Sequence, residues 1–449
     1  LGTYRREDIL SGEDGETHPL AETLRRMSRE RLYDEVALEP LERADLTAML
    51  EHALGSADLE PEFVDRLHRD SEGNPFYLIE TLHLWRDQGL VREGDEGWTL
   101  APDAGEIEIP STVADVLMRR IERAPEADRE LLDWASVLGG TLDVGVLASL
   151  LGAPRLMTTK RLGALEQRHG LLRSDEGGYH FAHAKIRQVL YDRMPLPLRR
   201  EVHLAIGDIL EERCTGPSDP LVYDLAHHYA RAGQAAKGYR YTVMAADRAE
   251  ASFAPVEAAA YLEQALKLGE QTPANAERRA QQLGLRHRLA HLLATLGRQD
   301  EACSTFEAAL ALSQELDHRR TEAELLLDLG VARGRVGDWL AARDLGERSL
   351  ALAQAIASAE RQASALLSTG FFAFEQGEWE EALRRLQRAS AIAQEGGLEL
   401  LQARILGNMG IVHDARGEGE RAIALYGQSI ATFERLGLPL DQGRGLSNL

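Results

Sequence analysis

One motif recurs four times in this chain, as Leu296-Gly297-Arg298-Gln299-Asp300, Val336-Gly337-Asp338-Trp339, Gln376-Gly377-Glu378-Trp379 and Arg416-Gly417-Glu418-Gly419. Its glycines are spaced 40 residues apart. Five residues after each glycine stands an alanine, at Ala302, Ala342, Ala382 and Ala422. Seven residues before each glycine stands a small residue, at Ala290, Gly330, Gly370 and Gly410. Three landmarks in one register indicate an internal repeat.

Each repeat is expected to be a pair of antiparallel helices. The glycine can take the left-handed conformation that ends the first helix, because it has no Cβ. Acidic residues such as Asp338 and Glu378 then suit the positive end of the next helix dipole. The small residues allow the two backbones to approach closely. Apolar side chains are expected to fill the space between the helices, namely Leu289, Leu293, Phe306, Leu329, Leu386, Met409 and Tyr426.

The order of small residue, turn glycine and alanine resembles the tetratricopeptide repeat, with helices longer than in its usual unit of about 34 residues. The resemblance implies an α-solenoid over residues 276–449. A degenerate repeat is expected within a helical connector at 196–275, with its second helix at 253–266 and its first helix at 230–233 or directly after. The register predicts a small residue after Leu449, so we expect the chain to stop within a helix and to be cut at both ends from a longer protein.

Solenoids bind partners along their inner face. The residue after the small position is apolar in three of the four repeats, at Val331, Phe371 and Ile411, and Phe374 follows one turn later. These four side chains are predicted to form a partner groove. The alternative is that they pack between neighbouring repeats, because monomers rarely expose large apolar patches.

Composition restricts the class of protein. The formal net charge of −22 opposes a broad nucleic-acid footprint, and only 6% of the residues are aromatic. Cys214 and Cys303 are far apart and lack the C-x-x-C spacing of a metal site, so we expect a reducing, cytoplasmic location. No apolar run approaches the ~18 residues that a transmembrane helix needs, so we expect no membrane partner.

Residues 109–195 have the pattern of a winged helix. Thr112 is expected to cap a first helix, a second follows Pro125 and ends at Gly139-Gly140, a third spans 146–151, and a fourth spans about 155–168. A hairpin is predicted from 171–174 to 179–182, joined by an Asp-Glu-Gly-Gly turn. The fourth helix carries the basic residues of a DNA-reading alternative, namely Arg155, Lys160, Arg161 and Arg168. The other reading is an internal regulatory module.

The chain then shows a series of motifs similar to one family of signalling proteins. They are Gly2-Thr3-Tyr4-Arg5, His18-Pro19-Leu20, Val36-Ala37-Leu38-Glu39-Pro40-Leu41, Ser71-Glu72-Gly73-Asn74-Pro75-Phe76-Tyr77-Leu78, Ile109-Pro110-Ser111-Thr112-Val113, Arg129–Gly139 and Phe181–Tyr191. In this order they resemble the signal-transduction ATPases with numerous domains. Bacterial members include LuxR-type activators of the maltose-regulon kind and ATPase modules fused to class III cyclases or Ser/Thr kinases.

The resemblance implies a mainly α chain. It implies the end of an AAA-like α/β core at 1–36, a helical lid at 37–108, the winged helix at 109–195, the connector at 196–275 and the solenoid at 276–449. Thr3 and Arg5 would belong to the strand that senses the γ-phosphate, Gly73 and Pro75 to a lid helix against adenine, and His183 to a diphosphate sensor. The alternatives are a strand-end charge at Arg5, a helix-start residue at Pro75 and a packing group at His183.

The sequence contains no G-x-x-x-x-G-K-[ST] loop to hold the phosphates. The apolar strand ending in acidic residues, which would supply the magnesium ligand ahead of the Leu1 strand, is not part of it either. This chain is therefore expected to have no catalytic residues and not to hydrolyse ATP. The parent would be the ATPase, using ATP or ADP with Mg²⁺. His287 and His291 lie four residues apart on one helix face, but no HExxH glutamate lies between them, so no metal site is predicted.

Three functions remain open. The first is a nucleotide-dependent switch whose repeats bind a protein or small-molecule effector, with nucleotide-dependent self-association, and with DNA bound only through a domain outside this chain. The second is a tetratricopeptide scaffold without functional nucleotide binding. The third is the regulatory part of a cyclase or kinase whose catalytic domain lies elsewhere.

Overall fold

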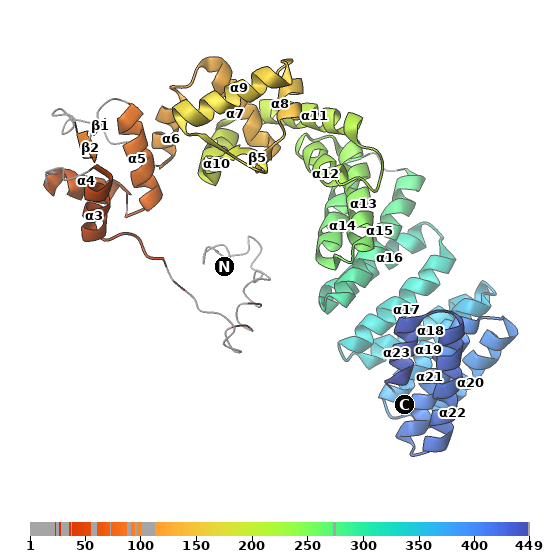
Figure 1. Ribbon diagram of the computed structural model, residues 1–449. Helices are drawn as coiled ribbons and strands as arrows, with labels where there is room; N and C mark the ends of the chain where they lie inside the picture. Colours follow the sequence, from red (N-terminus) through yellow and green to blue (C-terminus); the bar gives the residue numbers. More distant parts are fainter. Residues whose placement is uncertain are drawn as a thin grey trace. The chain divides into compact units, whose positions relative to one another are not determined.

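The computed structural model describes residues 23, 27, 36, 38–54, 61–71, 73–87, 91–94, 97–100, 113–272 and 275–447. Helices dominate this part of the chain, which confirms the mainly α class (Figure 1). The chain divides into two compact units, Leu1–Ser136 with Lys160–Arg193, and Val137–Thr159 with Met194–Leu449. The domain boundaries given above stay predictions. No described helix is both long enough and apolar enough to cross a membrane.

From Arg43 to Leu100, the described residues of the first unit form three helices and a hairpin. They are α3 (Arg43–Leu54), α4 (Pro61–Ser71), α5 (Pro75–Asp87), β1 (Val91–Gly94) and β2 (Gly97–Leu100). The helices bury a shared set of apolar side chains, Leu46, Leu50, Val64, Leu67, Leu78, Leu82 and Leu84. The antiparallel hairpin pairs Val91 with Leu100 and Gly94 with Gly97. This hairpin was not predicted from the sequence, because Arg92 and Glu93 interrupt the apolar alternation that marks a strand.

The region predicted as a winged helix contains the four predicted helices and the hairpin, together with elements that were not predicted. In chain order they are α6 (Val113–Ile121), α7 (Glu126–Leu138), β3 (Thr141–Leu142), α8 (Val144–Leu150), α9 (Arg155–Ala164), a π-helical turn η2 (Leu165–His169), β4 (Leu172–Asp175), β5 (Gly178–Phe181) and α10 (Ala184–Arg193). Of these, β3, η2 and α10 were not predicted. The predicted hairpin is confirmed within one residue, since Leu172 pairs with Phe181 and Asp175 with Gly178. Thr112 lies outside the described residues. The winged-helix class itself stays a prediction.

Four helices connect to the repeats, α11 (Leu196–Arg213), α12 (Leu221–Arg231), α13 (Ala235–Ala251) and α14 (Pro255–Glu270). The helices α13 and α14 pack against each other, so the first helix of the early unit follows Gly233, which is one of the two predicted positions. The second helix begins at Pro255 and not at Phe253. The reason is local, because Phe253 has a left-handed φ of 56° and proline favours the first helical position.

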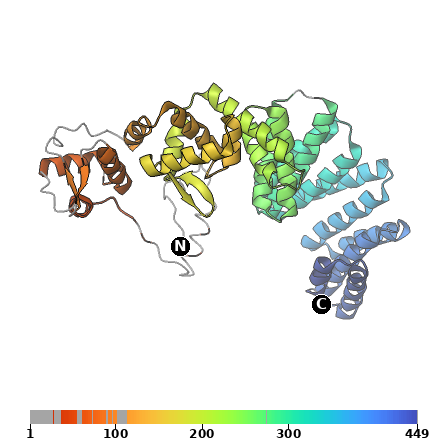
Figure 2. The same cartoon turned by 45° about the horizontal axis from the view of Figure 1, so that its top comes forward.

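Nine helices follow between residues 276 and 446. They are α15 (Ala276–Thr295), α16 (Gln299–Glu315), α17 (Arg319–Arg335), α18 (Trp339–Ala355), α19 (Ala359–Glu375), α20 (Trp379–Glu395), α21 (Glu399–Ala415), α22 (Gly419–Arg435) and α23 (Pro439–Leu446). The pairs α17 with α18, α19 with α20 and α21 with α22 pack closely, and Figure 2 shows their succession from a second side.

The turns between these helices share one backbone conformation. The predicted left-handed glycines are confirmed, with φ of 82° at Gly297, 87° at Gly337, 77° at Gly377 and 75° at Gly417. Positive φ also occurs midway between them, at Asp317, Ala357 and Gly397, and 20 residues after the last of them, at Gly437. A left-handed residue therefore ends a helix every 20 residues from 297 to 437.

The predicted packing within each pair is also confirmed. The alanines of the motif are buried, at Ala302, Ala342, Ala382 and Ala422. A Cβ added to Gly370 would lie 3.1 Å from Leu386 Cγ, and one added to Gly410 would lie 2.6 Å from Tyr426 Cε1. The small residues thus permit the close approach that the sequence predicts. Of the predicted filling residues, all are buried except Met409, which is half-buried.

Candidate functional site

Among the residues with predicted nucleotide roles, Gly73, Pro75 and His183 belong to the first unit. Thr3 and Arg5 lie outside the described residues, so their roles stay predictions. Gly73 has a φ of 70°, and its carbonyl accepts a hydrogen bond from the Leu41 N–H at 2.8 Å. A side chain at Gly73 would collide with the Leu41 carbonyl. Glycine is therefore required there by the fold, whatever else it contacts.

Pro75 is the first residue of α5 and is exposed. The Phe76 N–H donates to Asn74 Oδ1 at 3.0 Å, which satisfies one of the free N–H groups at the start of the helix. Proline costs nothing at this position, because its missing N–H would have no partner within the helix. The structure thus gives Pro75 the helix-start role, and the adenine contact stays a prediction.

A stacked pair of rings brings the two predicted regions together. The rings of Phe76 and His183 lie with centroids 3.8 Å apart and planes 23° from parallel. His183 precedes α10, and its Nδ1 accepts a hydrogen bond from the Lys185 N–H at 3.1 Å. The start of α5 and the start of α10 therefore meet at one contact. Phe76 was not predicted from the sequence, although an aromatic residue directly after the lid proline was a usable signal.

The predicted partner groove falls on the first helices of consecutive pairs. Val331, Phe371 and Ile411 lie on α17, α19 and α21, and α19 contacts both of the other helices. Because the three residues occupy the same register on adjoining helices, they form one strip, which we call the inner strip. Phe371 is 37% exposed, while Val331 and Ile411 are half-buried. Phe371 is thus the side chain of the inner strip that is most open to contact.

Phe374 has a different environment. It is half-buried and packs against the core of α19, α20 and α21. Its ring centroid lies 6.4 Å from that of Phe371. Phe374 therefore lies between Phe371 and the core. This position fits the packing alternative better than the groove.

His291 occupies the position of the inner strip on α15, one repeat before Val331. Its side chain is 55% exposed. A hydrogen bond with Asp328 raises the pKa of His291. Burial acts to raise the pKa of Asp328, but the hydrogen bonds with His287 and His291 outweigh it and the pKa is lowered. A His291–Asp328 ion pair thus lies at one end of the inner strip.

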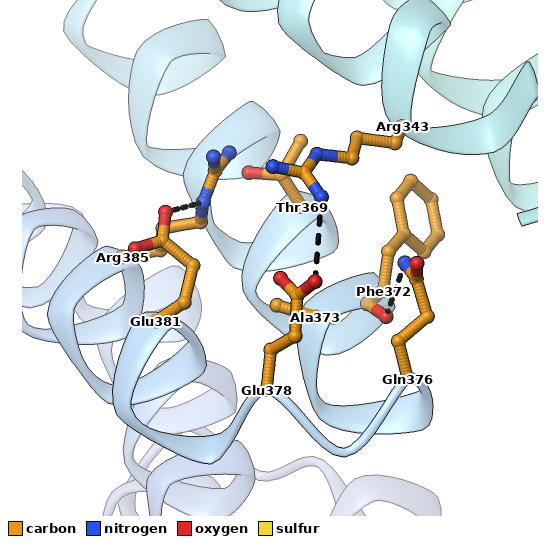
Figure 3. A pocket seen from close by; sticks show the side chains of 8 residues that line it. All are labelled: Arg343, Thr369, Phe372, Ala373, Gln376, Glu378, Glu381 and Arg385. Carbon is orange, nitrogen blue, oxygen red and sulfur yellow. Dashed lines mark hydrogen bonds and ion pairs between the residues drawn. The ribbon is translucent and has the colours of Figure 1, made fainter. Parts of the chain in front are cut away.

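A pocket between α18, α19 and α20 is closed by its own side chains (Figure 3). It is lined by Arg343, Thr369, Phe372, Ala373, Gln376, Glu378, Glu381 and Arg385. Arg385 Nε donates to Glu381 at 2.6 Å, and Arg343 lies 3.5 Å from Glu378. The charged groups are paired with one another, so this pocket is a junction between repeats held by ion pairs.

Comparisons with known proteins bear mainly on the repeats. The tetratricopeptide repeat family matches residues 281–355 and 361–435. No curated protein sequence matches the chain. Among solved structures, BtubC (BKLC) from P. vanneervenii is similar at 20% identity over 53% of this chain and 92% of that chain, with a TM-score of 0.39.

Two further solved structures are similar. PH0952 from Pyrococcus horikoshii, a STAND protein with a tetratricopeptide repeat sensor, has 14% identity over 92% of this chain and 63% of that chain, with a TM-score of 0.34. The Rap conjugation gene regulator of plasmid pLS20, in complex with the Phr* peptide, has 12% identity over 56% of this chain and 73% of that chain, with a TM-score of 0.41.

The 40-residue register, the left-handed turns and the family match all concern the same helices. The C-terminal region of the chain is therefore built from tetratricopeptide repeats.

Proposed function

We propose that the repeats bind a protein or peptide through the inner strip. The observation that carries this proposal is the exposure of Phe371 between Val331 and Ile411 on adjoining helices. Neighbouring packed helices lie about 8–10 Å apart, so the strip offers apolar contacts at regular intervals along the array. Such an arrangement suits a partner that presents apolar side chains along a helix or an extended segment.

The charge of the chain adds a condition on the partner. With a formal net charge of −22, the protein favours partners that carry basic residues around an apolar centre. Phe371 is the expected anchor, since large aromatic side chains contribute most where they become fully covered.

Site-specific photo-cross-linking tests this proposal. A photoreactive amino acid at position 371 is compared with one at position 340. Leu340 is 81% exposed and lies on α18, which is the second helix of its pair and does not carry the inner strip. We expect a discrete cross-linked partner from position 371 and none from position 340. The substitution Phe371→Ala should then weaken binding of the purified partner by roughly tenfold or more. Equal cross-linking from both positions, or unchanged affinity, would reject the inner strip as the binding surface.

For the parent protein we propose a nucleotide-dependent switch of the signal-transduction ATPase type, binding ATP or ADP with Mg²⁺. Two observations support it. The motifs follow one another in the order of that family, and the Phe76–His183 stack joins the start of α5 to the start of α10. A nucleotide that contacts both segments differently in its two states would shift their arrangement. The phosphate-binding loop would have to come from sequence outside this chain.

The test uses the protein extended through its upstream reading frame. We expect a G-x-x-x-x-G-K-[ST] loop there, together with ADP binding that weakens in His183→Ala. The control is His180→Ala on β5, whose imidazole lies 3.6 Å from Asp175. If the extended protein lacks that loop, or does not bind ADP, the nucleotide switch is rejected. The tetratricopeptide scaffold without nucleotide binding is then the function supported. A catalytic domain in the flanking sequence would instead establish the cyclase or kinase alternative.

A further inference from the structure

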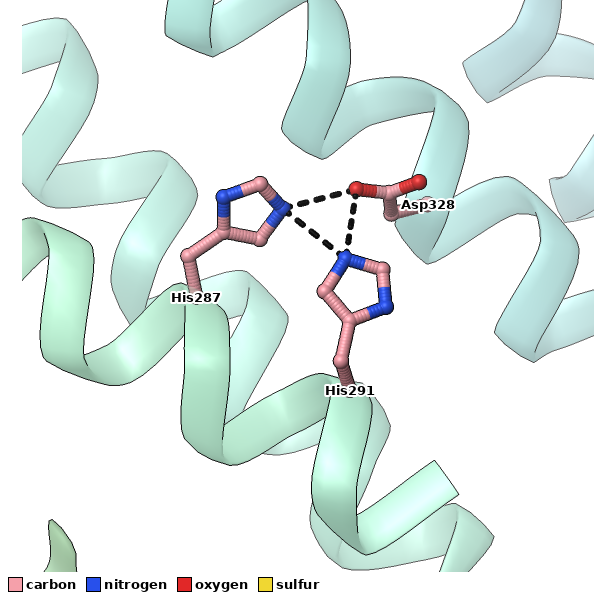
Figure 4. A group of neighbouring side chains, drawn as sticks. All are labelled: His287, His291 and Asp328. Atoms are coloured by element: carbon pink, nitrogen blue, oxygen red, sulfur yellow. Dashed lines mark hydrogen bonds and ion pairs between the residues drawn. The ribbon is translucent and has the colours of Figure 1, made fainter. Parts of the chain in front are cut away.

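Three potential metal ligands converge at the start of the repeats (Figure 4). His287 and His291 lie one turn apart on α15, and Asp328 lies on α17, the first helix of the next pair. His287 Nε2 is 2.8 Å from Asp328 Oδ2, and His291 Nε2 is 3.1 Å from the same oxygen. The two Nε2 atoms are 3.1 Å apart. Two imidazoles and one carboxylate therefore point at a common centre.

We propose that His287, His291 and Asp328 bind a divalent transition metal, Zn²⁺ in the first instance, with the fourth coordination position open to water. Zinc holds nitrogen and oxygen ligands at about 2.0–2.1 Å, which places neighbouring ligand atoms of a tetrahedron about 3.3 Å apart. The observed separations are 2.8, 3.1 and 3.1 Å. Outward shifts of a few tenths of an ångström would complete the geometry.

The donor set decides between metals. Imidazole nitrogen suits Zn²⁺, Cu²⁺ and Ni²⁺, whereas Ca²⁺ and Mg²⁺ favour sites made of oxygen ligands. Two histidines and one carboxylate leave one position of a tetrahedral site open. Within the part of the chain that the structure describes, this is the one group of three or more His, Cys, Asp or Glu side chains that meets the distance requirement of a metal site.

Neighbouring side chains largely cover His287 and Asp328 and leave His291 exposed to solvent. Phe306 on α16 is buried, and its ring centroid lies 6.1 Å from that of His287 and 5.2 Å from that of His291. The side chains of His287 and Asp328 are 19% and 23% exposed, whereas that of His291 is 55% exposed. The packed side restricts the rotamers of the ligands, and the open side gives the ion access from solvent.

A bound ion would link two consecutive repeats. His287 and His291 belong to the pair α15–α16, and Asp328 belongs to the pair α17–α18. Asp328 lies one helical turn before Val331, and His291 has the register of the inner strip on α15, so the metal site would lie at the end of the inner strip. The metal site does not depend on the proposed partner, because it is complete without one.

The competing reading is a hydrogen-bonded triad in which Asp328 Oδ2 accepts from both imidazoles and no metal binds. Asp328→Asn separates the two readings. An asparagine oxygen can still accept from an imidazole N–H, but a neutral amide is a poor zinc ligand. Its effect on the metal-free fold should be small, and its effect on metal affinity large.

The experiment uses the full chain, purified without a polyhistidine tag and stripped with a chelator. Co²⁺ is titrated as a spectroscopic probe, and Zn²⁺ is titrated by calorimetry. We expect one site per chain, the visible absorption of tetrahedral Co²⁺, and a rise in Tm with Zn²⁺. Each of His287→Ala, His291→Ala and Asp328→Asn should weaken binding by roughly 100-fold or more.

His318→Ala is the matched control, because it removes an exposed histidine from the same segment and should leave the affinity unchanged. Circular dichroism of each metal-free variant verifies that it is folded. The proposal is overturned if the wild-type chain shows neither the cobalt spectrum nor the rise in Tm. It is also overturned if Asp328→Asn binds zinc as tightly as the wild type, since the ion would then lie elsewhere.

Discussion

Arg120 and Glu80 form a buried ion pair that joins α6 to α5, with side chains only 1% and 7% exposed. Arg120 Nε also donates to the His169 carbonyl at 3.0 Å. Buried ion pairs of this kind are costly to break, because the remaining charge loses its partner without regaining water. The stability of the first unit thus depends on an ion pair within its core.

Arg120→Ala should lower the free energy of unfolding by about 3–5 kcal/mol, because the buried Glu80 carboxylate would lose the opposite charge of Arg120. Arg43→Ala is the control, since the Arg43–Asp65 pair links α3 to α4 with side chains 51% and 49% exposed. Its loss should cost about 1 kcal/mol or less. Urea denaturation, with hydrogen exchange to localise the effect to α6, measures both. Similar losses in the two variants would contradict the role given to burial.

Ala357→Gly should stabilise the repeats by about 0.5–1 kcal/mol. Ala357 is exposed and has a left-handed φ of 51°, which an L-residue with a Cβ adopts only at a cost. Gly377→Ala is the reverse change at a φ of 77°, where an added Cβ would meet no atom within 4 Å, so it should destabilise by about 1 kcal/mol through the backbone alone. Thermal unfolding should move Tm in opposite directions, and shifts of the same sign would refute this account.

Gly410→Ala should destabilise by about 1–3 kcal/mol, because its Cβ would lie 2.6 Å from Tyr426 Cε1 and force the helices α21 and α22 apart. Gly427→Ala offers the matched control on α22. That glycine is exposed, and an added Cβ has no neighbour within 4 Å. Alanine favours the helix there by about 0.5–1 kcal/mol, so this variant should be more stable than the wild type in urea. A stabilising Gly410→Ala would show that the pair is not closely packed.

The stability of the connector helices should fall as the pH is lowered from 6.5 towards 4. His203 Nδ1 and His228 Nδ1 lie 2.9 Å apart, and the two side chains are almost completely buried. Burial lowers the pKa of His203 to about 4 and that of His228 to about 3, and the neighbouring charge of His227 acts in the same direction. The unfolded chain therefore takes up protons first, near its ordinary pKa of about 6.5.

The resulting loss is up to about 1.4 kcal/mol per pH unit for each histidine, and stability is fully retained above pH 6.5. Urea unfolding between pH 7.5 and 4.5, followed by hydrogen exchange in α11 and α12, measures the slope. His228→Phe should flatten it, whereas His318→Ala should not. A slope that is unchanged in His228→Phe would assign the pH dependence to other groups.

The sequence predicted the repeats well because their landmarks are residue types with a direct conformational meaning. Glycine at 297, 337, 377 and 417 signals a left-handed turn by its chemistry. The equally left-handed turns at Asp317 and Ala357 were not foreseen, since alanine carries no such signal and aspartate carries a much weaker one than glycine. Their position halfway between the glycines was the remaining clue.

The site was harder to predict, because its contacts join segments far apart in sequence. Phe76 and His183 meet only after α5 and α10 have packed into one unit. Asp328 follows His287 by 41 residues, one repeat plus one position, so the pair alone gave no third ligand. Placing Asp328 in the register of α15 puts it beside His287, and this step would have revealed the cluster.

The left-handed turn every 20 residues makes the single helix the unit in which this array could change length. The buried small residues at 290, 330, 370 and 410 and the inner strip lie on alternate helices only. Inserting one 20-residue helix would make every later first helix of a pair a second helix, and every later second helix a first helix. The later part of the inner strip would then lie on the opposite side of the array. Inserting two would restore it. Repeat arrays derived from this one by duplication should therefore differ from it in length by an even number of helices.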